Sequence, residues 1–328
     1  MAVQPSRPNQ FGMTAYYWML AIGFLDLFTP LLPVPNAFCE KLFTIAITSL
    51  YMASVVGFAL AIARMRLSVL STLGVIWLSG VAWFIEYDYM DPKIMLAGHR
   101  FERLGGEPTP LQMVAFSYPP ALASLALIGA AVGIGALVAR IIKHPNLIGP
   151  IGVLVALVDT WGVLFGGIVS KLLTSPVTAG LAKHAMASGP HSFAIGPPPA
   201  YSVDVPDVGI GDFLFISLLL TVLVNLNMNW KGAAWVMGGL STMALCLIAL
   251  RVQIPVPHHG TFKMMPIPAL PGLVFIGGGA VLTNLKSFQF TREEKFALLY
   301  AGAFVIVLSA VLYLGFSYTL HSAAAITH

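Results

Sequence analysis

The sequence predicts an all-α fold of the membrane class, a polytopic transmembrane helical bundle with about nine transmembrane helices. Two observations of composition carry this prediction: 58% of the 328 residues are hydrophobic and only 9% are charged. A soluble fold of this size needs more charge to cover its surface, and the apolar content excludes a disordered chain. The mean hydropathy of +0.85 agrees. The apolar stretches are also long and unbroken, which favours helices over membrane strands.

A bilayer core of about 30 Å requires about 20 apolar residues in a helix. The stretches that meet or nearly meet this length are 14–34, 42–63, 67–85, 111–139, 147–172, 211–229, 233–250, 268–285 and 296–320. We therefore expect four transmembrane helices in residues 1–146, a second group in 147–285, and a last helix with a tail in 286–328. The segment 174–210 is rich in Pro, Gly, Ser and Ala, which predicts an extended and mobile loop.

The charges indicate a bilayer as partner and not nucleic acid. The net charge is +4, but the Lys and Arg residues are scattered over short loops, as in segments that flank lipid. Nearly equal numbers of them fall on the two sides of the expected helices, so orientation stays open. Arg64, Arg66, Arg140 and Lys143 flank helices directly and lean toward a cytoplasmic N-terminus. Oligomeric state is not predicted.

Three carboxylates lie within or at the start of apolar stretches: Asp26, Asp159 and Asp212. A carboxylate in hydrocarbon costs a few kcal/mol or more, so such groups face a cavity or a partner and usually carry function. No Lys or Arg stands at matching depth to form an ion pair with them. The sequence therefore places its candidate chemistry on these acids, with Asp26 the least probable participant.

Asp159 and Asp212 are placed to act together. Asp159 lies about halfway along 147–172, and Asp212 opens 211–229, the next helix along the chain. Two close carboxylates cannot both be ionised cheaply, so they share one proton. One is then a general base and the other a general acid, which activates water against an amide without a metal or a covalent intermediate. We expect no metal and no cofactor.

The residues before Asp212 and before the stretch 268–285 also carry information. Gly209 and Gly211 let backbone or water approach the carboxylate and permit positive φ; the ordinary alternative is a helix start with Asp212 as its N-cap. The run Met265–Leu273 contains three prolines, which suit the first turn of a helix. Those prolines equally favour extended backbone whose carbonyls line a cavity or pair with an extended peptide.

In this order the three elements resemble the presenilin and signal peptide peptidase superfamily of intramembrane aspartyl proteases. Asp159 matches the first aspartate of that family, which lies inside a helix. The Gly-x-Gly-Asp motif is matched by Gly209-Ile210-Gly211-Asp212-Phe213, and the Pro-Ala-Leu motif by Pro268-Ala269-Leu270-Pro271. The likeness covers residues 147–285. Val158 stands where the family usually has Tyr, and one further apolar stretch follows the Pro-Ala-Leu helix.

The resemblance implies a presenilin-like fold with 147–285 as catalytic core, and an intramembrane aspartyl endopeptidase that cleaves transmembrane peptides. It implies Asp159 and Asp212 as catalytic residues. It implies substrate binding by Gly209, Gly211, Pro268, Ala269, Leu270 and Pro271. Two alternatives remain. A proton- or cation-coupled transporter also uses carboxylates near broken helices, although the chain has no second copy of the Asp motifs. The second alternative is a catalytically silent presenilin-like protein, because Val158 replaces the Tyr that stands beside the first aspartate in that family.

Overall fold

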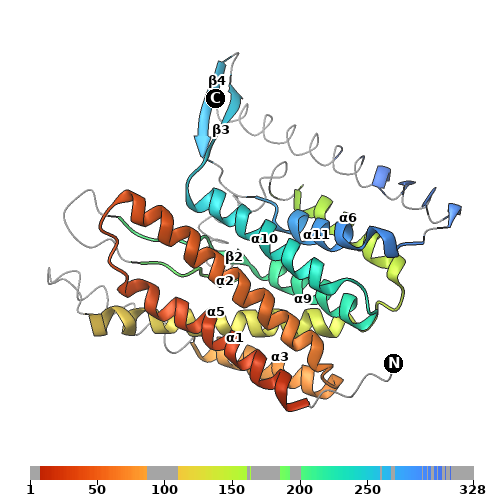
Figure 1. The fold of residues 1–328 in the computed structure, drawn as a ribbon, viewed down its shortest axis with the longest axis horizontal. Helices are drawn as coiled ribbons and strands as arrows, with labels where there is room; N and C mark the ends of the chain where they lie inside the picture. Colours follow the sequence, from red (N-terminus) through yellow and green to blue (C-terminus); the bar gives the residue numbers. More distant parts are fainter. Residues whose placement is uncertain are drawn as a thin grey trace, which may run out of the picture.

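A computed structural model shows a mostly helical chain (Figure 1). The structure describes residues 8–86, 110–160, 163, 185–192, 201–258, 261–266, 270–289, 291–293, 295–296, 299–300, 302–304, 307 and 311. Its α-helices are α1 (Pro8–Phe28), α2 (Ala37–Met65), α3 (Val69–Ile85), α5 (Pro110–Val138), α6 (Ile148–Thr160), α9 (Ile210–Asn225), α10 (Trp230–Ala249) and α11 (Gly272–Asn284). Short 3₁₀ turns cover η1 (Thr29–Leu31), η3 (Pro145–Leu147) and η5 (Leu285–Ser287).

These helices fall on the apolar stretches that the sequence predicts, with ends that mostly differ by a few residues. For the stretch 147–172, α6 is described to Thr160, and nearly all of 161–172 lies outside the described residues. Local signals fix several of those ends. The Asn36 side chain caps α2 by accepting from the Cys39 N–H at 2.9 Å, and the Ser68 hydroxyl caps α3 by accepting from the Ser71 N–H at 3.1 Å. Most of the expected helix 296–320 lies outside the described residues.

Three of the described helices are long and apolar enough to cross a bilayer: α2, the Ser117–Val138 part of α5, and α10, with mean hydropathies of 2.1, 2.3 and 1.7. Large apolar side chains stand on the outside of the bundle, among them Trp77 of α3 and Trp235 of α10, which is 83% exposed. Such a surface suits lipid rather than water. The chain is a multi-pass integral membrane protein.

The expectation of a purely α-helical fold is wrong in one respect, because two antiparallel strand pairs occur. β1 (Met186–Ala187) pairs with β2 (Val208–Gly209), and β3 (Gln253–His258) pairs with β4 (Thr261–Pro266). Prolines within β3 exclude a helix there, since proline lacks the N–H that a helix requires. In Figure 1 the β3–β4 hairpin projects beyond the end of α10.

The described parts of 174–210 form backbone hydrogen bonds with one another and with α5. The Ser192 N–H donates to the Val203 carbonyl at 2.8 Å, and the Ser188 N–H donates to the Ser124 hydroxyl of α5 at 3.1 Å. Ala187 and Val203 are fully buried. Backbone near a bundle must find partners for its N–H and C=O groups, and here strand pairing supplies them.

Helix α9 forms the centre of the bundle. It packs against α2, α5, α10 and α11, and its apolar side chains are buried on all sides, as for Phe213, Leu220 and Leu223 at 0% exposure. One continuous apolar core runs from Ala15 to Ala280 and therefore crosses the expected boundary at residue 146. This central position fixes both ends of α9, including the end that carries Asp212.

Helix α5 approaches its neighbours closely where glycines replace side chains. A Cβ on Gly133 would lie 2.7 Å from Cγ1 of Ile76 in α3. A Cβ on Gly135 would overlap the backbone of α9 at Leu214 and would lie 2.9 Å from the Leu218 nitrogen. Small residues at such crossings let membrane helices pack backbone against backbone.

Candidate active site

Helices α6 and α11 run side by side and meet at three levels (Figure 1). At one end the Asn146 side chain donates to the Gln289 carbonyl at 2.9 Å and accepts from its N–H at 3.2 Å. In the middle a Cβ on Gly277 would lie 2.7 Å from the Gly152 carbonyl oxygen. At the third level Asp159 reaches the first turn of α11. This pairing fixes the position of Asp159 along the axis of α11.

Asp159 makes one hydrogen bond that defines its place. The Leu273 backbone N–H donates to Oδ2 of Asp159 at 2.8 Å. Leu273 is the second residue of α11, whose N-cap, Pro271, offers no side-chain cap of its own. The positive end of a helix favours a carboxylate, so Asp159 stabilises the start of α11 from a neighbouring helix. The ordinary structural role of Asp159 is therefore that of a cap.

Asp212 reaches the same turn of α11 from a different helix. A Cβ on Gly272 would lie 2.7 Å from Oδ1 and 2.9 Å from Cγ of Asp212. The Asp212 carboxyl thus rests against Gly272, one residue before the amide that Asp159 accepts from. Asp159 is also close enough to act electrostatically on Asp212. The structure brings the two predicted catalytic acids together at Gly272–Leu273.

This arrangement suits chemistry that two acids perform. Both carboxyls are partly buried. Among the described residues no Lys or Arg side chain forms an ion pair with either of them, and Asp159 accepts from the backbone N–H of Leu273. Neighbouring carboxyls that share a proton provide a base and an acid at one place. In the described part of the chain no group of three or more His, Cys, Asp or Glu residues is arranged to hold a metal ion.

Gly209 does not adopt the positive φ that the sequence allowed, and Asp212 is not the N-cap of its helix. Gly209 is the N-cap of α9 with φ −65° and ψ 144°, so positive φ is not what it supplies, and Asp212 is the third helical residue rather than the N-cap. Gly209 pairs with Met186 of β1. Among the described residues, no atom lies within 4 Å of the place that a Cβ on Gly209 or Gly211 would take. These two glycines therefore do not serve close packing against the described part of the chain.

The Pro-Ala-Leu segment is described in part. Pro268 and Ala269 lie outside the described residues. Leu270 is half-buried, and Pro271 is buried at the start of α11. The backbone that leads to this segment is the extended strand β4, as the proline spacing predicts. Gly272 and Leu273, which follow Pro271 in α11, contact the two aspartates.

Two other residues singled out in the sequence lie apart from these carboxyls. Val158, where the resembling family has Tyr, is 57% exposed on α6. Asp26 is buried at 7% exposure, and neither of its carboxyl oxygens has a hydrogen-bond partner among the described residues. It borders a small cavity shared with Ser188 and His191. Asp26 therefore belongs to a separate polar environment.

Sequence reasoning missed the two residues of α11 that contact the acids, Gly272 and Leu273. They directly follow Pro271, and the signal that could have found them is the Pro-Gly step itself. Proline suits the start of a helix, and a residue without Cβ leaves space for a side chain from another helix.

No protein-family model matches the chain, and neither curated proteins nor solved structures give a significant match. The likeness to presenilins and signal peptide peptidases thus rests on the motifs of this sequence.

Proposed function

We propose that the chain is an intramembrane aspartyl endopeptidase that hydrolyses peptide bonds within transmembrane segments. The observation that carries the proposal is the convergence of Asp159 and Asp212 on Gly272–Leu273, the first turn of α11. Asp159 and Asp212 come from α6 and α9, which are separate in the chain and each pack against α11, the helix that follows Pro271.

In this proposal the ionised carboxylate of the pair takes a proton from water as the water oxygen attacks the scissile carbonyl carbon. The protonated carboxyl donates its proton to the carbonyl oxygen, which gives a tetrahedral intermediate. The intermediate then collapses, the C–N bond breaks and the leaving nitrogen takes a proton back from the pair. No covalent bond forms between enzyme and substrate.

The proposed substrate is an unwound stretch of a transmembrane helix. An amide inside a helix is shielded by its own hydrogen bonds, so cleavage requires extended backbone. β2 ends at the N-cap of α9, the helix that carries Asp212, β4 lies shortly before α11, and each pairs with one strand among the described residues. An edge of either strand offers backbone groups to an extended peptide. No described atom stands within 4 Å of a Cβ position on Gly209 or Gly211, which suits such an approach.

The test compares Asp159→Asn and Asp212→Asn with wild type in proteoliposomes, with a tagged single-helix protein as substrate and gel detection of its fragments. General acid–base catalysis contributes about 10²–10⁴-fold, so each variant is expected to lose at least that much cleavage. The matched control is Asp26→Asn, which removes another carboxylate from an apolar helix and is expected to retain cleavage. Cleavage that survives in Asp159→Asn or Asp212→Asn refutes the proposal.

A second candidate function is proton- or cation-coupled transport, and Asp26 is the observation in its favour. A buried carboxylate whose oxygens have no partner among the described residues is typical of ion pathways. Ion-gradient-driven uptake by the wild type that Asp26→Asn abolishes, with no proteolysis of any helical substrate, would favour transport over the protease.

A further inference from the structure

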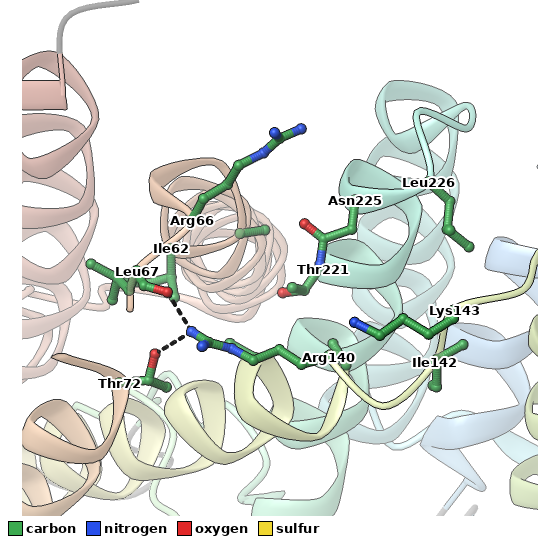
Figure 2. A pocket seen from close by; sticks show the side chains of 13 residues that line it. Ile62, Arg66, Leu67, Thr72, Arg140, Ile142, Lys143, Thr221, Asn225 and Leu226 are labelled. Atoms are coloured by element: carbon green, nitrogen blue, oxygen red, sulfur yellow. Dashed lines mark hydrogen bonds between the residues drawn. The ribbon is translucent and has the colours of Figure 1, made fainter. Parts of the chain in front are cut away.

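A polar pocket lies at the end of α9 away from Asp212. It has a volume of about 380 Å³ and lies among the ends of α2, α5 and α9 (Figure 2). Along α9 the residues rise by about 1.5 Å each, which separates Asn225 at this pocket from Asp212 by about 20 Å. The pocket is therefore a site distinct from the two aspartates.

The pocket is lined by cations without a carboxylate. Arg66, Arg140 and Lys143 contribute to its wall, and no Asp or Glu is among its lining residues. Within the described part of the chain, neither Arg66 nor Lys143 makes a hydrogen bond or an ion pair. Figure 2 shows Lys143 extending toward Arg140 across the floor of the pocket. Uncompensated positive charge of this kind favours an anionic ligand.

Arg140 is fixed at the wall by the link between α2 and α3. One guanidinium nitrogen, Nη2, donates to the Thr72 hydroxyl at 2.8 Å and also to the Leu67 carbonyl oxygen (Figure 2). A guanidinium has five N–H donors, so these bonds orient the group and leave donors for a ligand. Arg140 is thus a cation held in position before any ligand binds.

Thr221 is a second, independent indication of a ligand. It is 6% exposed and lines the pocket, and its hydroxyl has no hydrogen-bond partner among the described residues. Figure 2 shows the hydroxyl directed toward the pocket, with Asn225 beside it one helical turn away. A buried hydroxyl without a partner costs free energy, which a bound acceptor would recover. The dipoles of helix C-termini explain cations at this place but not an unpartnered hydroxyl.

We propose that this pocket binds a phosphate ester. The phosphate oxygens accept from Arg140, from the flexible Arg66 and Lys143, and from the Thr221 hydroxyl. Three cations match the one or two negative charges of such a group, and the ends of membrane-spanning helices lie at the depth of lipid phosphates. The ligand is the head group of an anionic lipid or a soluble phosphate ester, since both present the same chemistry.

The experiment measures binding to the full chain and is independent of any proteolytic activity. The thermal unfolding midpoint of detergent-purified protein is followed while phosphatidylglycerol, phosphatidylcholine or glycerol phosphate is titrated in separate arms. The charge variant is Arg66→Gln with Lys143→Gln. Its control is Lys231→Gln with Lys286→Gln, which removes the same charge from exposed residues outside the pocket. Thr221→Val removes only the unpartnered hydroxyl.

We expect phosphatidylglycerol to raise the midpoint more than phosphatidylcholine. We expect the charge variant to weaken that binding about 25-fold, since each of its two lost cations contributes about fivefold. The control keeps wild-type binding. Thr221→Val keeps the ligand-free midpoint or raises it, yet binds more weakly, which a structural role would not produce. A response to glycerol phosphate with the same variant dependence supports the soluble source. No response in either anionic arm, or equal loss in the control, overturns the proposal.

Discussion

At the scale of the residue, the site depends on one backbone amide and one missing side chain. Asp159 accepts from the Leu273 N–H at 2.8 Å, and Asp212 occupies the space that a Cβ of Gly272 would take. These two contacts differ in kind. The first stabilises a helix end, whereas the second only leaves room for a carboxyl. Substitutions can therefore separate stability from activity at neighbouring positions.

Gly272→Ala is expected to reduce cleavage without unfolding the protein. The new Cβ would lie 2.7 Å from Oδ1 of Asp212, which is the end of a side chain and can move away. A displacement of about 1 Å from the productive geometry costs on the order of 10²-fold in rate. The control is Gly278→Ala on the same helix, where the new Cβ would have no described atom within 4 Å, and it should cleave normally. Equal rates for the two variants would contradict this reading.

Asp159→Ala and Asp159→Asn are expected to differ in stability although both lose cleavage. Asparagine keeps an oxygen that accepts from the Leu273 N–H, whereas alanine leaves the amide without its cap. Loss of a cap costs about 0.5–2 kcal/mol. Unfolding in detergent should therefore show a lower midpoint for Asp159→Ala than for Asp159→Asn. Identical midpoints would mean that the hydrogen bond contributes nothing.

At the scale of the element, the pairing of α6 with α11 sets the position of Asp159. At one end of the pair, the Asn146 side chain forms two hydrogen bonds with the backbone of Gln289. At the middle, Gly152 packs against Gly277. Because α6 is a rigid helix, these two levels determine where the far end presents its carboxylate. The geometry of the candidate site is thus decided partly by residues that never approach a substrate.

Gly277→Ala is expected to lower both stability and cleavage, in contrast to Gly272→Ala. Its Cβ would lie 2.7 Å from the carbonyl oxygen of Gly152, and backbone cannot move aside as a side chain can. Overpacking of this kind lowers the free energy of unfolding by about 1–3 kcal/mol. The helices must separate, which draws Asp159 away from Leu273. Thermal unfolding and cleavage measured on the same preparation test this, with Gly278→Ala again as control; an unchanged midpoint would refute it.

At the scale of the whole molecule, basic residues gather at one end of the bundle. Arg64 lies in the last turn of α2, and Arg66, Arg140 and Lys143 follow α2 or α5. The Arg64 guanidinium stacks over the ring of Trp230, the first residue of α10, at 5.2 Å. The Asn229 N–H, just before α10, donates to the Asn284 side chain of α11 at 2.8 Å, which joins that turn to the end of α11. Asp159 and Asp212 lie at the ends of α6 and α9 that are far from these basic residues.

We expect the basic end to face the cytoplasm, because Lys and Arg next to membrane helices are retained on that side. Lys143→Cys and Arg251→Cys, each in a chain with Cys39 and Cys246 replaced by Ser, place single thiols at the two ends. A membrane-impermeant maleimide applied to intact cells should label the thiol at position 251 and spare the one at 143. Labelling at position 143 without labelling at 251 would show that the basic end faces the cell exterior, contrary to this prediction.

The sequence by itself determined the membrane class, the approximate bounds of the helices and the candidate acids. These properties are local. Apolar length specifies a span, prolines exclude helix in β3, and a side chain such as that of Asn36 caps the helix it precedes. The cost of a carboxylate in an apolar helix likewise follows from its immediate neighbours, so Asp159 and Asp212 stood out without any tertiary information.

Only the tertiary structure decided which residues meet. Helix α9 is apolar on every side and buried on every side, so its sequence does not indicate which face contacts α5 or α11. Glycine contacts fix those choices, because they depend on matching surfaces from distant segments. For the same reason Arg66, Arg140 and Thr221 share a pocket that no spacing predicts, and Gly272 with Leu273 receives both aspartates.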